Sequence, residues 1–142
     1  MLEKFLNAQD SGVYEMALKE IQNGKKKTHW MWFIFPQLDG LGFSFMARKY
    51  SLKSKEEAKE YIENDTLRER LIEISNAILE LNAEDIQKVF YDPDDLKLKS
   101  CMTLFKYVSP EISVFQEVLD KYFDGEECEY TRNFFVEKDE KI

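Results

Sequence analysis

The sequence predicts an all-α protein, folded as a single compact domain of about seven helices in an irregular arrangement rather than a bundle. Apolar residues recur at helical spacing along most of the chain, as between Tyr14 and Ile21, whereas no segment alternates at the period of a strand. A chain of 142 residues suits one domain with a substantial core. We expect this domain to span residues 1–136, and residues 137–142 to form a frayed tail.

Capping patterns indicate where the helices begin. A serine or threonine three residues before a glutamate is typical of a helix start, because the two side chains bond the free backbone amides of the first turn. An aspartate or serine before a proline is a second start signal, since proline is favoured at the first helical position. These signals predict four helix starts, at Ser54, Thr66, Asp92-Pro93 and Ser109-Pro110, and Thr131 could cap a last short helix.

Composition excludes several classes of protein. The formal net charge of −8 opposes binding to an extended nucleic acid. No apolar run reaches the ~20 residues of a membrane span, and Glu3 stands where a signal peptide would carry basic residues. We therefore expect a cytoplasmic protein that does not bind membranes. Cys101 and Cys128 are expected to be reduced thiols, and with one histidine they do not make a zinc ligand set, so we expect no metal and no cofactor.

Basic residues are concentrated in one stretch of this acidic chain. Between Lys25 and Lys53, six basic residues stand against Asp39 alone, which gives the segment a charge of +5 and leaves −13 for the rest. A small basic segment suits a compact anion better than a long polyanion. Alternatively, Lys25, Lys26 and Lys27 form only the solvated end of a helix.

The segment from Thr28 to Ser44 has an unusual composition, THWMWFIFPQLDGLGFS. Six apolar residues run consecutively from Trp30 to Phe35, so a helix there would be apolar on every side and most of its rings are expected in the core. Three polar residues have no such explanation. An imidazole at His29 could donate, accept or titrate near neutral pH, Gln37 follows a proline, and Ser44 follows two glycines.

A second segment, from Asp92 to Phe105, is predicted to form a central helix that carries polar groups on apolar faces. Ser100 lies between leucines at i−4 and i+4, and Lys97 and Thr103 lie three residues to either side of it. A lysine beside two hydroxyls is a reasonable binder of an anion or a carbonyl. Alternatively, Ser100 and Thr103 bond back to helix carbonyls.

Together the two segments predict a site for a small anionic aromatic ligand, such as a nucleotide derivative. Cations would hold the anionic group, an aromatic face would stack on the ring, and amide and hydroxyl groups would give directional hydrogen bonds. If a reaction is catalysed, His29 is the best general acid or base. The predicted ligand-binding residues are Lys27, Trp30, Gln37, Ser44, Arg48, Lys97, Ser100 and Thr103. The alternative is a non-catalytic domain that docks a protein partner through an exposed aromatic surface.

The same segments carry a family resemblance. Lys27-x-HWMWFIFPQ, then Gly40-Leu41-Gly42-x-Ser44, then Asp94-x-x-Lys97-Leu98-x-Ser100-x-Met102-Thr103-Leu104-Phe105 closely resemble the bacterial domain of unknown function 1810 family. The resemblance covers nearly the whole chain and implies a small, mainly helical domain without an established activity. In the family pattern an acidic residue stands three positions before a threonine near the C-terminus. Here Cys128 occupies that position before Thr131, so Glu127 or Glu129 would have to replace the acid if it belongs to a site.

Overall fold

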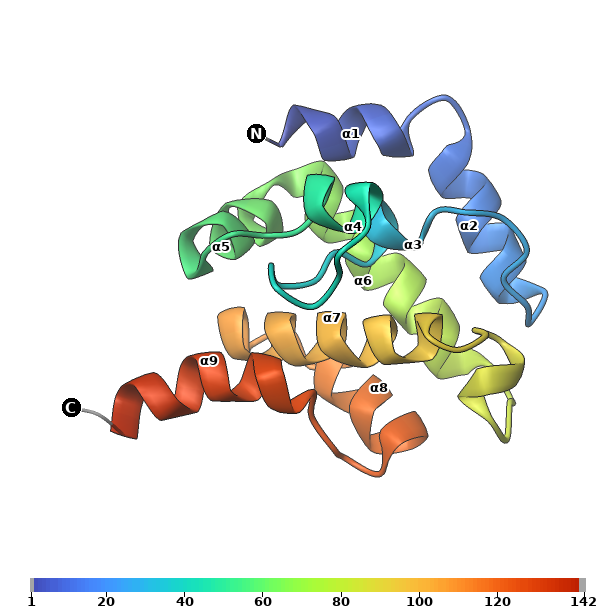
Figure 1. Cartoon of the computed structure of the whole chain (residues 1–142). Coiled ribbons are helices and arrows are strands. Elements are labelled where there is room, and N and C mark those ends of the chain that lie inside the picture. Colours follow the sequence, from blue (N-terminus) through green and yellow to red (C-terminus); the bar gives the residue numbers. More distant parts are fainter. Residues whose placement is uncertain (1, 141–142) are drawn as a thin grey trace.

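Nine α-helices and one 3₁₀ turn form the part of the chain that the structure, a computed structural model, describes (Figure 1). The backbone is described for residues 2–140 and the side chains for residues 2–136. No strand occurs in these residues, although Leu38 and Leu52 form one isolated parallel bridge. The all-α prediction is therefore confirmed. The elements are α1 (Glu3–Gln9), α2 (Val13–Gln22), α3 (Met31–Ile34), α4 (Phe45–Lys49), α5 (Lys55–Glu63), α6 (Asp65–Glu80), η1 (Ile86–Lys88), α7 (Asp94–Val108), α8 (Val114–Phe123) and α9 (Glu129–Glu140).

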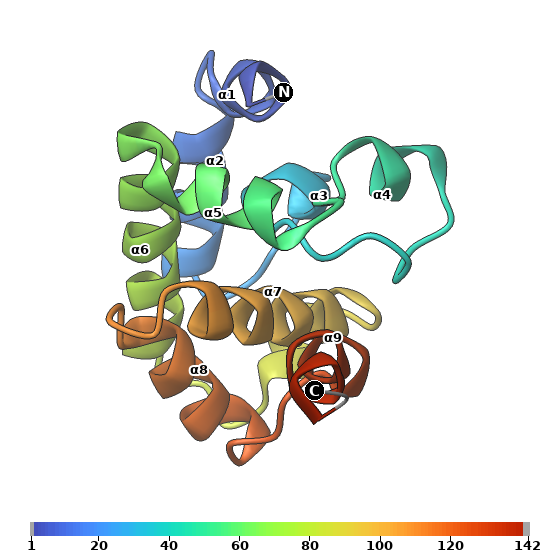
Figure 2. The ribbon, with the colours of Figure 1, turned by 90° about the vertical axis from the view of Figure 1, so that its left-hand side faces the viewer.

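Helix α7 lies at the centre of the fold. It packs against α5, α8 and α9, while α6 runs steeply across it and contacts α2, α5 and α8 (Figures 1 and 2). Its central position follows from its sequence, because eight of its fifteen residues are buried and they cover most of its circumference. The helices meet at varied angles, which is the irregular, non-bundle arrangement that the sequence predicts.

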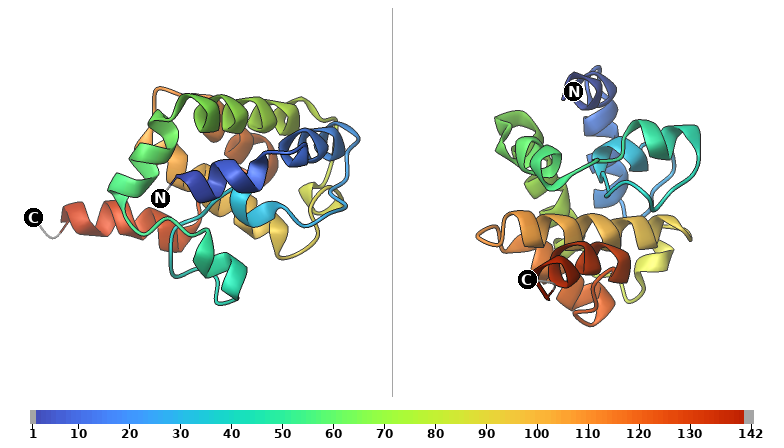
Figure 3. Two further views of the ribbon diagram at one scale, coloured as in Figure 1. Left: turned by 90° about the horizontal axis from the view of Figure 1, so that it is seen from above. Right: turned by 60° about the vertical axis from the view of Figure 1, so that its left-hand side comes forward.

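The apolar run that follows His29 forms the short helix α3 and lies in the core. Trp30, Met31, Phe33, Ile34 and Phe35 are all buried, as expected for most of these rings. The helix ends after one turn because Pro36 disfavours a helical conformation at the preceding residue, which adopts φ −123° and ψ 72°. The chain then leaves the core, and α4 with its flanking loops projects from the body of the protein (Figures 2 and 3).

Two short helices raise the helix count above the predicted seven. Helices α3 and α4 have four and five residues, too few to show a periodic pattern. Helix α4 begins at Ser44, whose side chain accepts a hydrogen bond from the Ala47 amide. The two glycines before Ser44 favoured a binding role for this serine, and its role as a helix cap was not predicted.

Of the predicted helix starts, Ser54 is confirmed, while the other three and the cap at Thr131 are displaced. The Ser54 hydroxyl accepts the Glu57 amide, as the capping pattern predicts. The N-cap of α6 is Asn64, two residues before the predicted Thr66 cap, and its side chain accepts a hydrogen bond from the Leu67 amide. Helix α7 begins at Asp94, one residue late, since the Pro93 carbonyl accepts the first intrahelical bonds.

The last two displaced starts lie around α8 and α9. Ser109 ends α7 and accepts the Ile112 amide in a turn, so α8 begins only at Val114. Helix α9 begins at Glu129, which puts Thr131 inside its first turn. The helix continues to Glu140, and the end of the predicted tail, residues 141–142, lies outside the described residues. No helix within residues 2–140 is long and apolar enough to cross a membrane.

Candidate functional site

A cavity of about 530 Å³ separates the segment around α4 from the first half of α7. This volume is in the range of sites for small molecules. The start of α9 closes one side of the cavity, so three parts of the chain that are distant in sequence meet there. The lining residues are Gln37, Leu41, Gly42, Phe43, Ser44, Ala47, Pro93, Leu96, Lys97, Lys99, Ser100, Cys128 and Glu129.

One wall of the cavity is a single face of α7. Leu96 and Ser100 are one helical turn apart and form its centre. At 100° per residue, Lys97 and Lys99 lie on opposite flanks of that line. The helix therefore presents a leucine and a hydroxyl in the middle of the wall and an ammonium group on each side.

The opposite wall is the loop that leads into α4, and α9 holds it in place. The Tyr130 hydroxyl of α9 donates to the Asp39 carbonyl at 2.8 Å. Gly40 has a φ of +103°, and a Cβ atom on it would lie 2.3 Å from the Tyr130 oxygen. Glycine is thus required here both by backbone conformation and by the close approach of the tyrosine. The contact fixes the loop that carries Leu41, Gly42 and Phe43 to the helix on the far side of the cavity.

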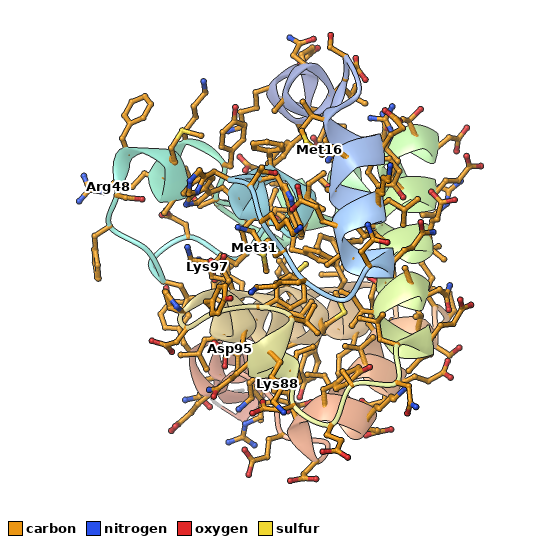
Figure 4. The ribbon with its side chains drawn as sticks, turned by 90° about the vertical axis from the view of Figure 1, so that its right-hand side faces the viewer. Met16, Met31, Arg48, Lys88, Asp95 and Lys97 are labelled. Atoms are coloured by element: carbon orange, nitrogen blue, oxygen red, sulfur yellow. The ribbon has the colours of Figure 1, made fainter. Side chains whose placement is uncertain are left out.

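Lys97 supplies a partly shared positive charge to one end of the cavity. Its Nζ lies 3.4 Å from an Asp94 carboxylate oxygen, and the other oxygen of that carboxylate is 3.0 Å from Lys26 Nζ. The Lys97 ammonium group also lies 5.4 Å from the centroid of the Trp32 ring, and this ring stabilises the cation. The single charge of Asp94 therefore neutralises only one of the two lysines. Figure 4 shows Lys97 between α7 and the α4 segment.

Gln37 lies in the cavity wall beside Lys97 with its amide available. No described residue forms a hydrogen bond with the Gln37 side chain, whereas its backbone carbonyl accepts the Leu52 amide. Gln37, Ala47 and Lys97 also line a second space of about 10 Å³ behind the cavity, next to Trp32 and Ser51. The side-chain amide can thus donate to or accept from a bound group.

Buried hydroxyls connect α7 to α9 on the inner side of the cavity. Ser100 Oγ lies 3.3 Å from Thr131 Oγ1, and Thr131 Oγ1 donates to Cys128 Sγ at 3.4 Å. Thr103 Oγ1 donates to the Lys99 carbonyl at 2.8 Å and accepts the Cys128 amide at 3.0 Å. Thr103 therefore bonds back within its helix, and only Ser100 of the two hydroxyls lines the cavity.

The structure brings four of the predicted site residues together and leaves five outside the cavity lining. Gln37, Ser44, Lys97 and Ser100 line it. Lys27 and His29 are exposed on the segment that leads into α3, and Arg48 points to solvent from α4 (Figure 4). Trp30 and Thr103 lie in the core and are not among the residues that line the cavity. The geometry thus gives no support for His29 as a general acid or base at this cavity.

Trp30 and the residues before it are organised by Glu20 of α2. The Glu20 carboxylate accepts hydrogen bonds from the Lys27 amide, the Thr28 amide and hydroxyl, and the Trp30 indole, at 2.6–3.0 Å. Burial acts to raise the pKa of Glu20, but these hydrogen bonds outweigh it and lower the pKa from 4.5 to about 2. The hydrogen bonds to Glu20 therefore hold the backbone of the segment that contains Lys27 and His29 in place.

Several lining residues were not among those predicted from the sequence. Leu96 and Phe43 resemble ordinary apolar positions there, yet they are 54% and 78% exposed at the cavity. Lys99 is two residues from Lys97 and could have been found from the helical period of α7. Cys128 and Glu129 belong to a distant part of the chain, and only the packing of α9 on α7 places them here.

Cys128, which stands in place of the acidic residue of the family pattern, occupies the N-cap position of α9. Cys128 directly precedes α9, and its carbonyl accepts the Arg132 amide at 2.9 Å, as the N-cap residue of a helix does. An acid three residues before Thr131 would bond the first-turn amides of this helix. An acid at this position could therefore cap α9, and it would also stand at the cavity, which Cys128 and Glu129 line.

Replacing Cys128 by aspartate should accordingly stabilise the protein. The new carboxylate would cap α9 and raise the free energy of unfolding by about 1 kcal/mol, which corresponds to an increase in Tm of roughly 3 °C for a chain of this size. Thermal unfolding followed by circular dichroism measures the change. Cys128→Ala is the control and should show no gain, while a Tm of Cys128→Asp at or below that of Cys128→Ala would contradict the assignment.

Comparison with known proteins agrees with this architecture. No curated protein matches the sequence significantly. The crystal structure of a conserved hypothetical protein from Mycobacterium tuberculosis is 41% identical and superposes with a TM-score of 0.90 over 94% of each chain. The sequence model of the family described as "Protein of unknown function (DUF1810)" matches residues 1–135, and the chain therefore belongs to that family.

Proposed function

We propose that this protein binds a small anionic ligand with a planar aromatic group, such as a nucleotide derivative, in the cavity between the α4 segment and α7. The observation that carries the proposal is the combination at one end of the cavity of an incompletely neutralised Lys97 and an unbonded Gln37 amide. Ser44 adds an exposed hydroxyl group, Ser100 lies in the wall with its hydroxyl beside that of Thr131, and Leu41, Phe43 and Leu96 add apolar surface for a ring. The cytoplasmic location expected from the sequence is part of this proposal.

The proposal is for binding and includes no chemical step. The titratable side chains among the lining residues are Lys97, Lys99, Cys128 and Glu129. Lys97 and Lys99 form ion pairs with Asp94 and Glu126 respectively. A general base is expected to lie within hydrogen-bond reach of a neighbouring nucleophile. In the described residues Glu129 forms no hydrogen bond to the hydroxyl of Ser100 or the thiol of Cys128, so no base–nucleophile pair carries a proposal of catalysis.

Titration calorimetry with a panel of nucleosides and nucleotides tests the proposal. We expect at least one compound to bind, and Lys97→Ala and Gln37→Ala each to weaken its binding roughly tenfold by removing one charge-assisted or directional hydrogen bond. His29→Ala is a matched control, because His29 is exposed and does not line the cavity. Unchanged affinity in both Lys97→Ala and Gln37→Ala, or loss of affinity in His29→Ala alone, would refute the assignment of the cavity.

A second candidate function is the docking of a protein partner through the α4 segment. Phe43 and Phe45 are 78% and 76% exposed, although Trp30, Phe33 and Phe35 are buried and cannot form the aromatic surface expected from the sequence. Phe45 does not line the cavity, which separates the two functions. Phe45→Ala should leave ligand affinity unchanged if the cavity is the site, and should abolish partner binding if the exposed rings are the site.

A further inference from the structure

The two ends of the cavity differ in their electrostatics. Lys97 and Lys99 flank the Leu96–Ser100 line of α7 on opposite sides, so each ammonium group belongs to one end. Each lysine has a different set of charged neighbours, which come from different elements. The charge that a ligand meets therefore depends on which end of the cavity it occupies.

At the Lys97 end, the ion pairs leave one lysine charge without a carboxylate of its own. Lys26 and Lys97 share the single carboxylate of Asp94, which leaves a balance of +1 on these three side chains. Both lysines also lie over indole rings, Lys26 at 5.2 Å from Trp30 and Lys97 at 5.4 Å from Trp32, and these contacts hold the cations in place. The Gln37 amide adds a neutral hydrogen-bond donor at the same end.

The Lys99 end is electrically balanced. Lys99 Nζ lies 3.5 Å from a Glu126 oxygen, and both residues line an adjoining hollow together with Glu127, Glu129 and Arg132. Glu127 is bound by the Lys106 ammonium group and the Tyr107 hydroxyl. Glu126 and Glu129 then balance Lys99 and Arg132, so a second anionic group at this end would find no net positive charge to offset its loss of hydration.

Between the two ends the cavity is apolar. Leu41, Phe43, Ala47, Pro93 and Leu96 contribute this surface, and the Phe43 ring and the Leu96 side chain are largely exposed to the cavity and solvent. A planar ring that covers them would remove apolar surface from water. From one end to the other, the cavity thus has a cationic region at Lys97, an apolar middle, and a region at Lys99 where positive and negative charges cancel.

On the basis of the proposed function, we propose that the ligand carries one negative charge, as a carboxylate or a phosphodiester, and binds with this group at Lys97 and Gln37. The planar group lies against Phe43 and Leu96, and a neutral or hydrogen-bond-donating end faces Glu129. This excludes di- and triphosphates as the preferred ligands, because the charges around the cavity compensate only one anionic group.

Two series of probes that differ in charge test this inference by titration calorimetry. The first is adenosine, adenosine 3′,5′-cyclic monophosphate, AMP, ADP and ATP, in which the base is constant and the charge becomes more negative. The second is indole-3-acetate against indole-3-acetamide, which tests a carboxylate against its neutral amide. We expect the singly charged member of at least one series to bind roughly tenfold more tightly than its neutral counterpart. ADP and ATP should bind no more tightly than the cyclic monophosphate.

The two lysines provide the matched variants. Lys97→Met keeps the apolar stem and removes the charge, and should abolish the preference for the singly charged probe. Lys99→Met removes a charge from the balanced end and should leave that preference intact. If ATP binds more tightly than the cyclic monophosphate, or if Lys99→Met abolishes the preference instead, the cavity binds ligands but this inference is wrong. If no probe of either series binds, the proposed function itself fails and the inference fails with it.

Discussion

Replacing Glu20 by alanine should lower the free energy of unfolding by about 3 kcal/mol, which for a chain of this size lowers the Tm by roughly 10 °C. The carboxylate accepts four hydrogen bonds from Lys27, Thr28 and Trp30, and alanine leaves these donors without their acceptor. The Trp30 indole is buried, so its N–H cannot turn to water without opening the core. Urea unfolding at neutral pH measures the loss.

The contribution of Glu20 should also depend on pH in a defined direction. Its pKa falls from 4.5 in the unfolded chain to about 2 in the folded protein, so the unfolded state binds the proton more tightly. The stabilisation is therefore complete above about pH 4.5 and is lost as the pH falls toward 2. The difference in unfolding free energy between the wild type and Glu20→Gln, which does not titrate, should shrink over this window.

Glu15 of the same helix provides the control for both measurements. It is exposed, and no hydrogen bond to its side chain occurs among the described residues. Glu15→Ala should change the unfolding free energy by less than about 0.5 kcal/mol at any pH. A Glu20→Ala variant as stable as Glu15→Ala would show that the segment from Lys27 to Trp30 is not organised by this carboxylate.

The role of Glu20 illustrates what sequence patterns cannot show. The helical period predicted α2, because that pattern depends on local spacing. Trp30 was predicted to bind the ligand, and its burial in the core was not foreseen. The hydrogen bond between Glu20 and Trp30 depends on the path of the chain through the turn after Gly24, which no spacing rule fixes. The same limit applies to Thr103, whose back-bonding was one of two readings that the sequence left open.

At the cavity, the residues that could be predicted are those with an anomalous local environment. Lys97 and Ser100 interrupt the apolar faces of α7, and Gln37 and Ser44 follow a proline and glycines, so each stood out in the sequence. Phe43, Leu96 and Glu129 are unremarkable in their own segments and become part of the cavity only through the packing of α4, α7 and α9. Two basic residues, by contrast, were wrongly predicted to line the cavity. Lys27 is exposed outside the cavity lining, and Arg48 points to solvent from α4 (Figure 4).

Replacing Gly40 by alanine should destabilise the protein by about 2 kcal/mol, through two effects that can be separated. The backbone at φ +103° disfavours any residue with a Cβ, and that Cβ would lie 2.3 Å from the Tyr130 hydroxyl oxygen. Gly12 isolates the first effect, because it has a φ of +85° and no atom within 4 Å of an added Cβ. Gly12→Ala should therefore cost only about 1 kcal/mol.

The second effect is the contact with Tyr130, and a double-mutant cycle measures it. Tyr130→Ala alone should cost about 1 kcal/mol, since it removes the hydrogen bond to the Asp39 carbonyl. In the Tyr130→Ala background the added Cβ at Gly40 has room, so the cost of Gly40→Ala should fall to that of Gly12→Ala, with a coupling energy of about 1 kcal/mol. If the losses in unfolding free energy of the two single mutants simply add in the double mutant, the Tyr130 side chain does not clash with a Cβ atom at position 40. The cavity wall from Leu41 to Phe43 would then owe its position to the bridge between Leu38 and Leu52 rather than to α9.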